Sequence, residues 1–430
     1  MLLTAMILLL FVFVFLGMDI AWAIATAALG FIALSQFGDS PVAFVLFVQQ
    51  MTNGVDSFAL LAVPMFIFAG ELMTAGGVTK RLIQFAYTLV GHRPGGLANV
   101  GITSNFVMSG VSGSALADAA ATGSVLIPEM KRRGYPPAYS CAVIAAGATM
   151  GPVIPPSISF ILLGAIVNLS VGQLFLAGIL PGILMFASLL IASRFMALRM
   201  GLPVEEKIMG RERWLALAGG ILPLLVPILV ILSKVMGIAT PTEAASLIVL
   251  YTAIIGVVVY RTLGPRTFLR AAGRAALISS VVMLTVATSQ IFASLAVLAH
   301  LGAILTSAML AISENPMVLL LMINIILLIM GMIMEPLPVM LILAPILFPL
   351  MAGMGVDPIH LGVVVVLNLM IGMVTPPIGL NLFVMSRIGG VGVMEIFRAG
   401  IPFMAALVVA LALVTYVPWI TTALPIWLMR

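Results

Sequence analysis

The sequence carries very little charge for a chain of 430 residues. Only 8% of its residues are Asp, Glu, Lys or Arg, whereas 63% are hydrophobic and the mean hydropathy is +1.29. Soluble domains carry about 25% charged residues, so this composition excludes a soluble domain. The apolar runs extend over roughly 17 to 25 residues, which suits membrane-spanning helices and not the short alternating strands of a barrel. We therefore predict an all-α polytopic membrane protein in a lipid bilayer.

The chain also has a single cysteine and none of the common catalytic signatures. Cys141 stands alone, which excludes an internal disulfide and a cysteine-based metal cluster. The motifs HExxH and GxSxG and the phosphate-binding loop are missing, so we expect neither an enzyme nor a cofactor. The net charge of +5 is explained by basic loops on the cytoplasmic side, and no nucleic-acid partner is expected.

Two proline-rich breaks interrupt otherwise apolar segments, at 151–157 (GPVIPPS) and 372–378 (GMVTPPI). A double proline removes two backbone donors and clashes with the preceding turn, so neither segment can continue as one straight helix. Unpaired backbone is tolerated within a membrane only where it is buried in protein or lines a polar cavity. Each break is therefore a candidate binding site.

The two breaks belong to an internal duplication. Shifting the sequence so that Pro155 falls on Pro376 also superposes further glycines and prolines of the two halves. These pairs are Gly110 with Gly331, Pro128 with Pro349, Gly134 with Gly355, Pro137 with Pro358 and Gly151 with Gly372. Turn and break residues match, whereas ordinary apolar residues mostly do not. A repeated backbone plan of this kind is found in many secondary transporters.

Each half predicts the same order of elements. The expected spans are 2–18, 20–37, 58–76 and 172–198 in the first half, and 214–233, 241–260, 277–299 and 397–418 in the second. Amphipathic or neutral arms are expected at 78–93 and 300–314, re-entrant hairpins at 97–128 and 316–353, and broken helices at 136–168 and 358–386. Arg266, Arg270 and Arg274 predict a separate surface segment before the span 277–299.

The fold class that follows is two inverted-topology repeats, each with a re-entrant hairpin and a broken helix, forming an elevator-type scaffold and a transport domain. The expected boundaries are 1–94 for scaffold spans and the first arm, 95–168 for the first transport half, 169–315 for further scaffold spans and the second arm, 316–386 for the second transport half, and 387–430 for the last span.

Charge counting predicts the orientation. If the first hairpin enters from the cytoplasm, all but Lys234 and Arg430 of the 19 Lys and Arg residues lie on the cytoplasmic side. The opposite orientation violates the positive-inside rule. We therefore expect a multi-pass membrane protein with both termini on the outer side.

Few ionisable residues lie deep in the predicted spans, and we place only Glu71, Asp118 and Glu335 there. Ser114, Asp118 and Thr122 recur every four residues and form one polar stripe. This stripe either faces a cavity or forms a hydrogen-bond seam between helices, and the pattern leaves both interpretations open. The glycines and prolines of the breaks likewise either build ion sites or only shape the hairpins.

The run 112–121 (SGSALADAAA), together with both breaks, resembles the large membrane subunit of tripartite ATP-independent periplasmic (TRAP) transporters, over essentially the whole chain. The resemblance implies the ion-transporter superfamily fold and a sodium-coupled elevator that imports organic anions. It also implies two partners, a small four-helix membrane subunit and a periplasmic substrate-binding protein.

The resemblance also implies specific site residues. One sodium site involves Ser112, Ser114, Gly151, Ile154 and Pro156. A second involves Gly331, Glu335, Gly372, Thr375 and Pro377. Ser159, Asn381 and Asp118 are the expected substrate contacts. Carboxylates, sugar acids and sulfonates all remain open as substrates. A stand-alone divalent-anion/sodium symporter and a membrane scaffold without transport are the alternative functions.

Overall fold

The computed structural model describes residues 2–38, 41–204 and 209–429. Within these ranges the ordered elements are helices and no strand occurs, which confirms the all-α prediction. Arg430, one of the two basic residues expected outside, falls beyond the described residues. Eight helical segments in the described ranges are long and apolar enough to cross a membrane. They are Phe58–Ala75, Val171–Met200, Gly210–Ser233, Pro241–Val259, Pro265–Leu298, Pro316–Ile333, Pro336–Gly353 and Val393–Tyr416.

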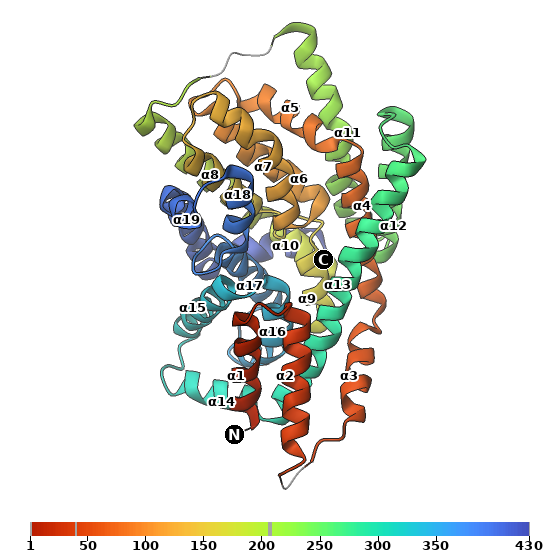
Figure 1. Ribbon diagram of the computed structural model, residues 1–430, viewed down its shortest axis with the longest axis vertical. Helices are drawn as coiled ribbons and strands as arrows, with labels where there is room; N and C mark the ends of the chain where they lie inside the picture. Colours follow the sequence, from red (N-terminus) through yellow and green to blue (C-terminus); the bar gives the residue numbers. More distant parts are fainter. Residues whose placement is uncertain (1, 39–40, 205–208, 430) are drawn as a thin grey trace.

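The first two helices are shorter than the spans expected at 2–18 and 20–37. Helix α1 (Leu2–Phe15) and helix α2 (Ile20–Ser35) pair with each other (Figure 1). Gly17 has a φ of +82°, which ends α1, and the Asp19 side chain accepts a hydrogen bond from the Ala21 amide at 3.1 Å, which begins α2. These local signals shorten α1 at the junction, whereas α2 begins at Ile20 as expected and is shorter only at its far end, Ser35.

A long, interrupted helical column follows. Helix α3 (Val45–Val55), the 3₁₀ turn η1 (Phe58–Leu61) and helix α4 (Ala62–Ala75) follow one another along helix α13 (Pro265–Leu298) (Figure 1). Ser294 of α13 donates a hydrogen bond to the Gln50 carboxamide oxygen of α3 at 3.1 Å. The polar side of α3 is thus used against another helix.

The rest of the first half contains the arm, a hairpin, a broken helix and a long span. They are α5 (Val78–Val90), α6 (Gly96–Ser112), α7 (Ala115–Arg132), α8 (Pro137–Ala148), α9 (Ile158–Ile166) and α10 (Val171–Met200). The hairpin arms α6 and α7 are longer than expected, and they meet at a turn where Gly113 has a φ of +62°.

The second half contains helices at the positions expected for its spans, arm, hairpin and broken helix. They are α11 (Gly210–Val235), α12 (Pro241–Ile254), the π-helical turn η2 (Ile255–Val259), α13, α14 (Leu301–Leu310), α15 (Pro316–Ile333), α16 (Pro336–Gly353), α17 (Pro358–Gly372), α18 (Leu380–Gly389), α19 (Val393–Tyr416) and α20 (Trp419–Leu428). The sequence did not predict α20 as a separate helix.

Helix α13 differs from its prediction. The arginine-bearing segment and the span 277–299 were expected to be separate, but they form one helix of 34 residues. Pro265 stands in its first turn, where the missing amide hydrogen costs nothing, and no other proline follows within the helix. Gly273 alone is too weak a breaker to end it.

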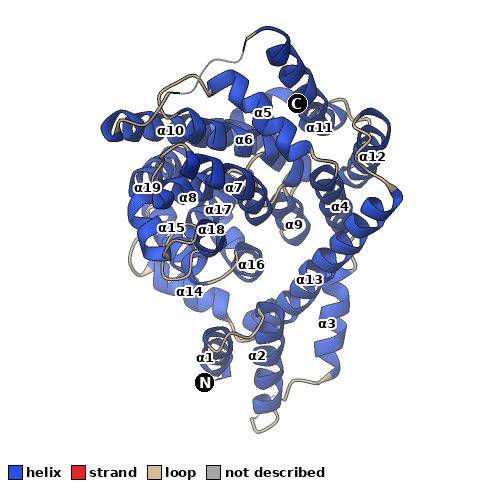
Figure 2. Cartoon of the chain, turned by 45° about the horizontal axis from the view of Figure 1, so that its top comes forward, coloured by secondary structure: helices blue, strands red, loops and turns tan. Residues whose placement is uncertain are grey.

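The helices form two groups (Figure 2). The hairpins and broken helices pack together with α10 and α19, while α2, α3, α4, α12 and α13 lie beside them. Helix α10 lies directly on the first break, because a β-carbon at Gly182 would come within 2.5 Å of Ile154 Cγ1. The two breaks and the two hairpin tips are thereby held in one packed unit.

Candidate functional site

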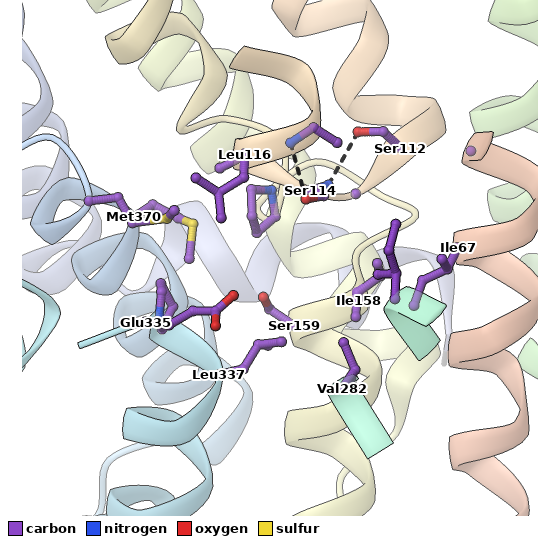
Figure 3. A pocket seen from close by; sticks show the side chains of 18 of the residues that line it. Ile67, Ser112, Ser114, Leu116, Ile158, Ser159, Val282, Glu335, Leu337 and Met370 are labelled. Carbon is purple, nitrogen blue, oxygen red and sulfur yellow. Dashed lines mark hydrogen bonds between the residues drawn. The ribbon is translucent and has the colours of Figure 1, made fainter. Parts of the chain in front are cut away.

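A cavity of about 430 Å³ lies between the tips of the two hairpins (Figure 3). Both groups of helices contribute to its wall. Hairpin 1 (α6 and α7) provides Ser112 to Ala117, and hairpin 2 (α15 and α16) provides Glu335, Pro336 and Leu337. The first break and α9 provide Pro152, Ile158 and Ser159, while α17 and the second break provide Met370 and Met373. The neighbouring α4 and α13 provide Ile67, Gly70, Glu71, Thr74, Ile278 and Val282.

The tip of hairpin 1 is organised by its own side chains. The Ser112 hydroxyl donates a hydrogen bond to Asp118 Oδ1 at 2.5 Å and accepts one from the Ser114 amide at 3.2 Å. The Ser114 hydroxyl caps α7 by accepting from the Ala117 amide at 3.4 Å. Ser112 and Ser114 therefore lie at the cavity with defined positions.

The first break packs against this tip. A β-carbon at Gly151 would lie 2.9 Å from Asp118 Oδ2 and 3.1 Å from the Ser114 carbonyl carbon. One at Gly113 would lie 2.7 Å from the Pro156 carbonyl oxygen. The structure thus brings Ser112, Ser114, Gly151 and Pro156 together.

Ile154 contributes to the same region in a different way. Its side chain packs against Gly182 of α10, away from the hairpin tip, and its amide donates to the Met150 carbonyl at 3.0 Å. Only its backbone carbonyl is therefore suited to the ligand role that the sequence analysis gave it.

The second break meets hairpin 2 through close backbone contacts. A β-carbon at Gly372 would lie 2.5 Å from the Gly331 carbonyl carbon and 2.7 Å from its Cα. The Ile378 amide donates a hydrogen bond to the Met332 carbonyl at 3.1 Å. Gly331 and Gly372 are therefore in direct contact, whereas the corresponding pair in the first half, Gly110 and Gly151, makes other contacts.

The side chains predicted for the second sodium site point in different directions. The Thr375 hydroxyl donates to the Ile371 carbonyl at 2.8 Å, and Pro377 is exposed. The Glu335 side chain extends into the cavity, on the side of Ser159 (Figure 3). Glu335 thus faces the central cavity directly.

Of the predicted substrate contacts, only Ser159 lines the cavity. Asn381 is buried, and its carboxamide nitrogen donates to the Ala145 carbonyl at 3.3 Å. Asp118 is also fully buried, beneath the tip of hairpin 1. Neither Asn381 nor Asp118 belongs to the cavity wall.

The polar stripe of Ser114, Asp118 and Thr122 on α7 has two different environments. The Thr122 hydroxyl lies 2.9 Å from Asn105 Oδ1, and the Asn105 carboxamide nitrogen donates to the Ile144 carbonyl at 3.3 Å. With the bond from Ser112 to Asp118, these contacts form a seam between α6, α7 and α8. Both interpretations of the stripe therefore apply, because Ser114 faces the cavity while Asp118 and Thr122 lie in the seam.

The sequence analysis missed the part of the wall that comes from the neighbouring helices. Glu71 and Thr74 of α4 line the cavity one helical turn apart. The available signal was Glu71 itself, because a carboxylate deep in an apolar span must face protein or water. It was recognised as deep but was not assigned to the site.

The wall of the cavity carries both positive partial charges and carboxylates. The first turns of α7, α9 and α16 all contribute wall residues, and helix N-termini carry partial positive charge. Glu71 and Glu335 add carboxylates. Within the described ranges no group of three or more His, Cys, Asp or Glu residues could hold a metal ion. The cavity suits an anion, and the carbonyls and hydroxyls of the adjoining breaks suit a hard cation.

These features define a class of protein. A helical membrane protein whose two hairpins and two broken helices surround a central cavity has the architecture of a secondary transporter. A solved structure, the YdaH transporter of Alcanivorax borkumensis, shares the fold with a TM-score of 0.63 over 89% of each chain, at 15% sequence identity.

Sequence comparisons give the family. The family model described as "Tripartite ATP-independent periplasmic transporter, DctM component" matches residues 7–420. The sialic acid TRAP large permease of Vibrio cholerae is 38% identical, over 96% of this chain and 95% of that protein. The 2,3-diketo-L-gulonate TRAP large permease of Escherichia coli is 37% identical over 94% of each chain. The C4-dicarboxylate TRAP large permease of Pseudomonas aeruginosa is 38% identical over 87% of each. The chain belongs to the DctM family, the large membrane subunit of TRAP transporters, which confirms the resemblance.

Proposed function

We propose that this protein is the large permease subunit of a sodium-coupled importer of small organic anions. The observation that carries the proposal is the cavity between the hairpin tips. Its volume of about 430 Å³ is in the usual range of roughly 300 to 1,000 Å³ for small-molecule sites. Three helix N-termini at its wall favour a negatively charged ligand.

The relatives narrow the class of substrate. The similar permeases are named for sialic acid, 2,3-diketo-L-gulonate and C4-dicarboxylates, and each of these compounds carries at least one carboxylate. We infer that the cavity of this chain takes a small carboxylate or sugar acid, with sulfonates as a further possibility because they offer oxygens of the same charge.

Sodium ions are proposed at the two junctions between hairpin and break. In the first, Ser112 and Ser114 meet the backbone of Gly151, Ile154 and Pro156. In the second, Gly331 meets Gly372, next to Thr375, Pro377 and Glu335. Backbone carbonyls and hydroxyls at both junctions are the oxygen ligands that a small hard cation prefers.

An elevator motion is proposed for the packed unit of hairpins and broken helices. The cavity is divided between this unit and the neighbouring α4 and α13, so movement of one group along the other would carry ligand past a fixed wall. Because α10 and α19 pack with the hairpins, we include both in the moving unit. The arms α5 and α14 would connect it to the scaffold.

The partners and location complete the proposal. A small four-helix membrane subunit and a periplasmic substrate-binding protein would act with this chain in the bacterial inner membrane, with both termini in the periplasm. The binding protein would deliver the anion to the outer face.

The test is uptake into proteoliposomes that contain this chain, the small subunit and the binding protein, with labelled sialic acid, 2,3-diketo-L-gulonate and a C4-dicarboxylate offered under a sodium gradient. Ser114→Ala and Glu335→Ala should weaken the dependence on sodium. Ser280→Ala and Glu314→Ala remove the same groups at exposed positions and should not.

Three outcomes contradict parts of the proposal. Uptake that needs no binding protein would indicate a stand-alone symporter. Wild-type sodium dependence in both site variants would show that the sodium sites are misassigned. Absence of any sodium-dependent uptake, with all partners present and each of the three acids tested, would favour a scaffold role.

A further inference from the structure

A second cavity, of about 280 Å³, lies away from the central one, where arm α5 leads into hairpin 1. We call it the Arg93–Arg194 cavity. Its wall consists of Val90, Arg93, Pro94, Asn99, Leu190, Ile191 and Arg194. It therefore joins the end of α5, the start of α6 and the C-terminal third of α10.

The floor of this cavity is fixed by one buried side chain. The carboxamide nitrogen of Asn99 donates a hydrogen bond to the Pro94 carbonyl at 3.0 Å, and its carboxamide oxygen accepts one from the Ser193 hydroxyl at 2.9 Å. Asn99 is 5% exposed. Asn99 thus joins Pro94, which lies between α5 and α6, to helix α10, and it defines the shape of the cavity before any ligand binds.

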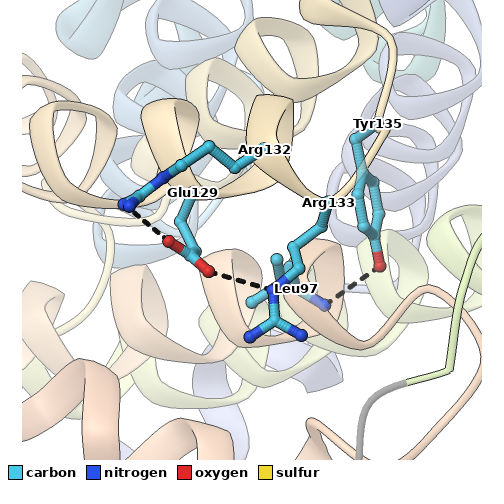
Figure 4. Close-up of polar contacts among 5 residues, drawn as sticks. All are labelled: Leu97, Glu129, Arg132, Arg133 and Tyr135. Carbon is cyan, nitrogen blue, oxygen red and sulfur yellow. Dashed lines mark hydrogen bonds and ion pairs between the residues drawn. The ribbon is translucent and has the colours of Figure 1, made fainter.

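Within the described residues, neither Arg93 nor Arg194 has a carboxylate partner. By contrast, Arg132 and Arg133 form ion pairs with Glu129 at 2.7 and 3.0 Å (Figure 4). Among the described residues Arg93 and Arg194 form no ion pair, and no acidic residue lines their cavity. Two guanidinium groups at one cavity favour an anion that accepts several hydrogen bonds, such as a phosphate.

An apolar ridge precedes Arg194 along α10. It consists of Ile183 and Ile191, which are 46% and 71% exposed, and it leads away from the C-terminal end of this helix. In a protein that spans the membrane, such a ridge contacts hydrocarbon. A ligand with a phosphate at one end and an acyl chain at the other would satisfy both the arginines and the ridge.

We propose that the Arg93–Arg194 cavity binds the headgroup of an anionic phospholipid, with the phosphate between the two arginines and an acyl chain along α10. The lipid would connect the end of arm α5 to α10 from the membrane side, opposite to Asn99. This inference does not depend on the transported substrate or on the coupling ion.

The test is native mass spectrometry of the purified protein titrated with phosphatidylglycerol or phosphatidylcholine. Wild type should retain phosphatidylglycerol preferentially. Arg93→Ala and Arg194→Ala should each weaken that retention about fivefold, and the double variant about 25-fold, as expected for basic side chains at an anionic lipid surface. Arg270→Ala removes an equally exposed arginine outside the cavity and should leave retention unchanged.

Two further experiments distinguish a lipid from a free anion. Inorganic phosphate should fail to displace phosphatidylglycerol at equal concentration, and Ile191→Asn should weaken lipid retention because it interrupts the ridge. The double variant Arg93→Lys/Arg194→Lys should keep part of the preference for the anionic lipid. Because both arginines are exposed, all variants should keep the wild-type thermal transition.

The proposal is overturned if the double alanine variant retains phosphatidylglycerol as wild type does, or if phosphatidylcholine is retained equally well by wild type. Displacement by inorganic phosphate together with no effect of Ile191→Asn would show that the site takes a free anion and not a lipid.

Discussion

Gly331 and Gly372 lie backbone to backbone where hairpin 2 meets the second break. No side chain separates the two elements, so their distance is set by main-chain atoms that cannot rotate away. At the first break, by contrast, Gly151 meets the Asp118 carboxylate and the backbone at Ser114. At the scale of single residues, the contact between hairpin and break is therefore made by different groups in the two halves.

We expect Gly372→Ala to destabilise the protein by about 1 to 3 kcal/mol, the usual cost of overpacking, and to reduce uptake strongly. The reason is the 2.5 Å approach of its new β-carbon to the Gly331 carbonyl carbon. Gly353→Ala, at the end of α16, meets nothing within 4 Å and should be neutral. Thermal unfolding of both variants in detergent measures the difference, and equal stabilities would contradict the contact.

The bond between Ser112 and Asp118 supports a second prediction. Asp118 Oδ2 has no hydrogen-bond partner within the described residues, so Ser112→Ala would leave the whole carboxyl group unpaired, at a cost of about 1 to 3 kcal/mol. In a double-mutant cycle on thermal unfolding, Ser112→Ala should cost less when combined with Asp118→Ala. Strict additivity would show that the 2.5 Å contact contributes nothing.

At the scale of elements, arm α5 is firmly attached to the neighbouring helices. The Arg81 guanidinium lies 3.6 Å from the centre of the Tyr260 ring, and the Tyr260 hydroxyl donates to the Gly219 carbonyl of α11 at 2.8 Å. Gly220 leaves room for Phe85 of the arm. If the hairpins move as proposed, the chain between arm α5 and hairpin 1 must bend. This bend falls after the attachment of α5, near Pro94 and Gly95, where Gly95 has a φ of +71°.

The elevator proposal predicts that hairpin 1 slides along α11. A β-carbon at Gly110 of α6 would lie 3.0 Å from Pro227 Cβ, close to the roughly 3.5 to 4.5 Å that a disulfide needs. Oxidation of Gly110→Cys/Pro227→Cys should stop uptake, and reduction should restore it. A disulfide in Gly256→Cys/Leu263→Cys joins two parts of the scaffold and should have no effect. If the oxidised Gly110→Cys/Pro227→Cys protein transports at the full rate, the elevator proposal is wrong.

Element types were predictable from the sequence because glycine and proline mark the breaks directly. Lengths were less predictable. Hydropathy predicts the arms of hairpin 1 at about 97–108 and 115–128, but the two helices continue beyond these apolar stretches, to Ser112 and Arg132. The cavity residues Ser112, Ser114, Ser159 and Glu335 were expected from the resemblance to the TRAP family and not from spacing. Asn381 was expected on the same ground, but its side chain turns toward Ala145, and helix rotation of this kind leaves no trace in spacing.

At the scale of the whole molecule, the distribution of basic residues predicts how the chain lies in the membrane. A cysteine at Arg133 or at Arg211 should react with impermeant thiol reagents only from the cytoplasmic side. The native Cys141 is buried and should remain silent, so wild type is the control. Labelling of both positions in intact cells from outside would reverse the orientation.

The contact between Gly331 and Gly372 also limits how this protein can change in evolution. At most packed contacts a larger residue on one side can be compensated by a smaller one on the other. Here both partners already lack a side chain, so neither can shrink to accommodate the other. A genetic selection that restores growth to Gly372→Ala should therefore return second changes in the loops that set the separation of the two elements, and none at position 331.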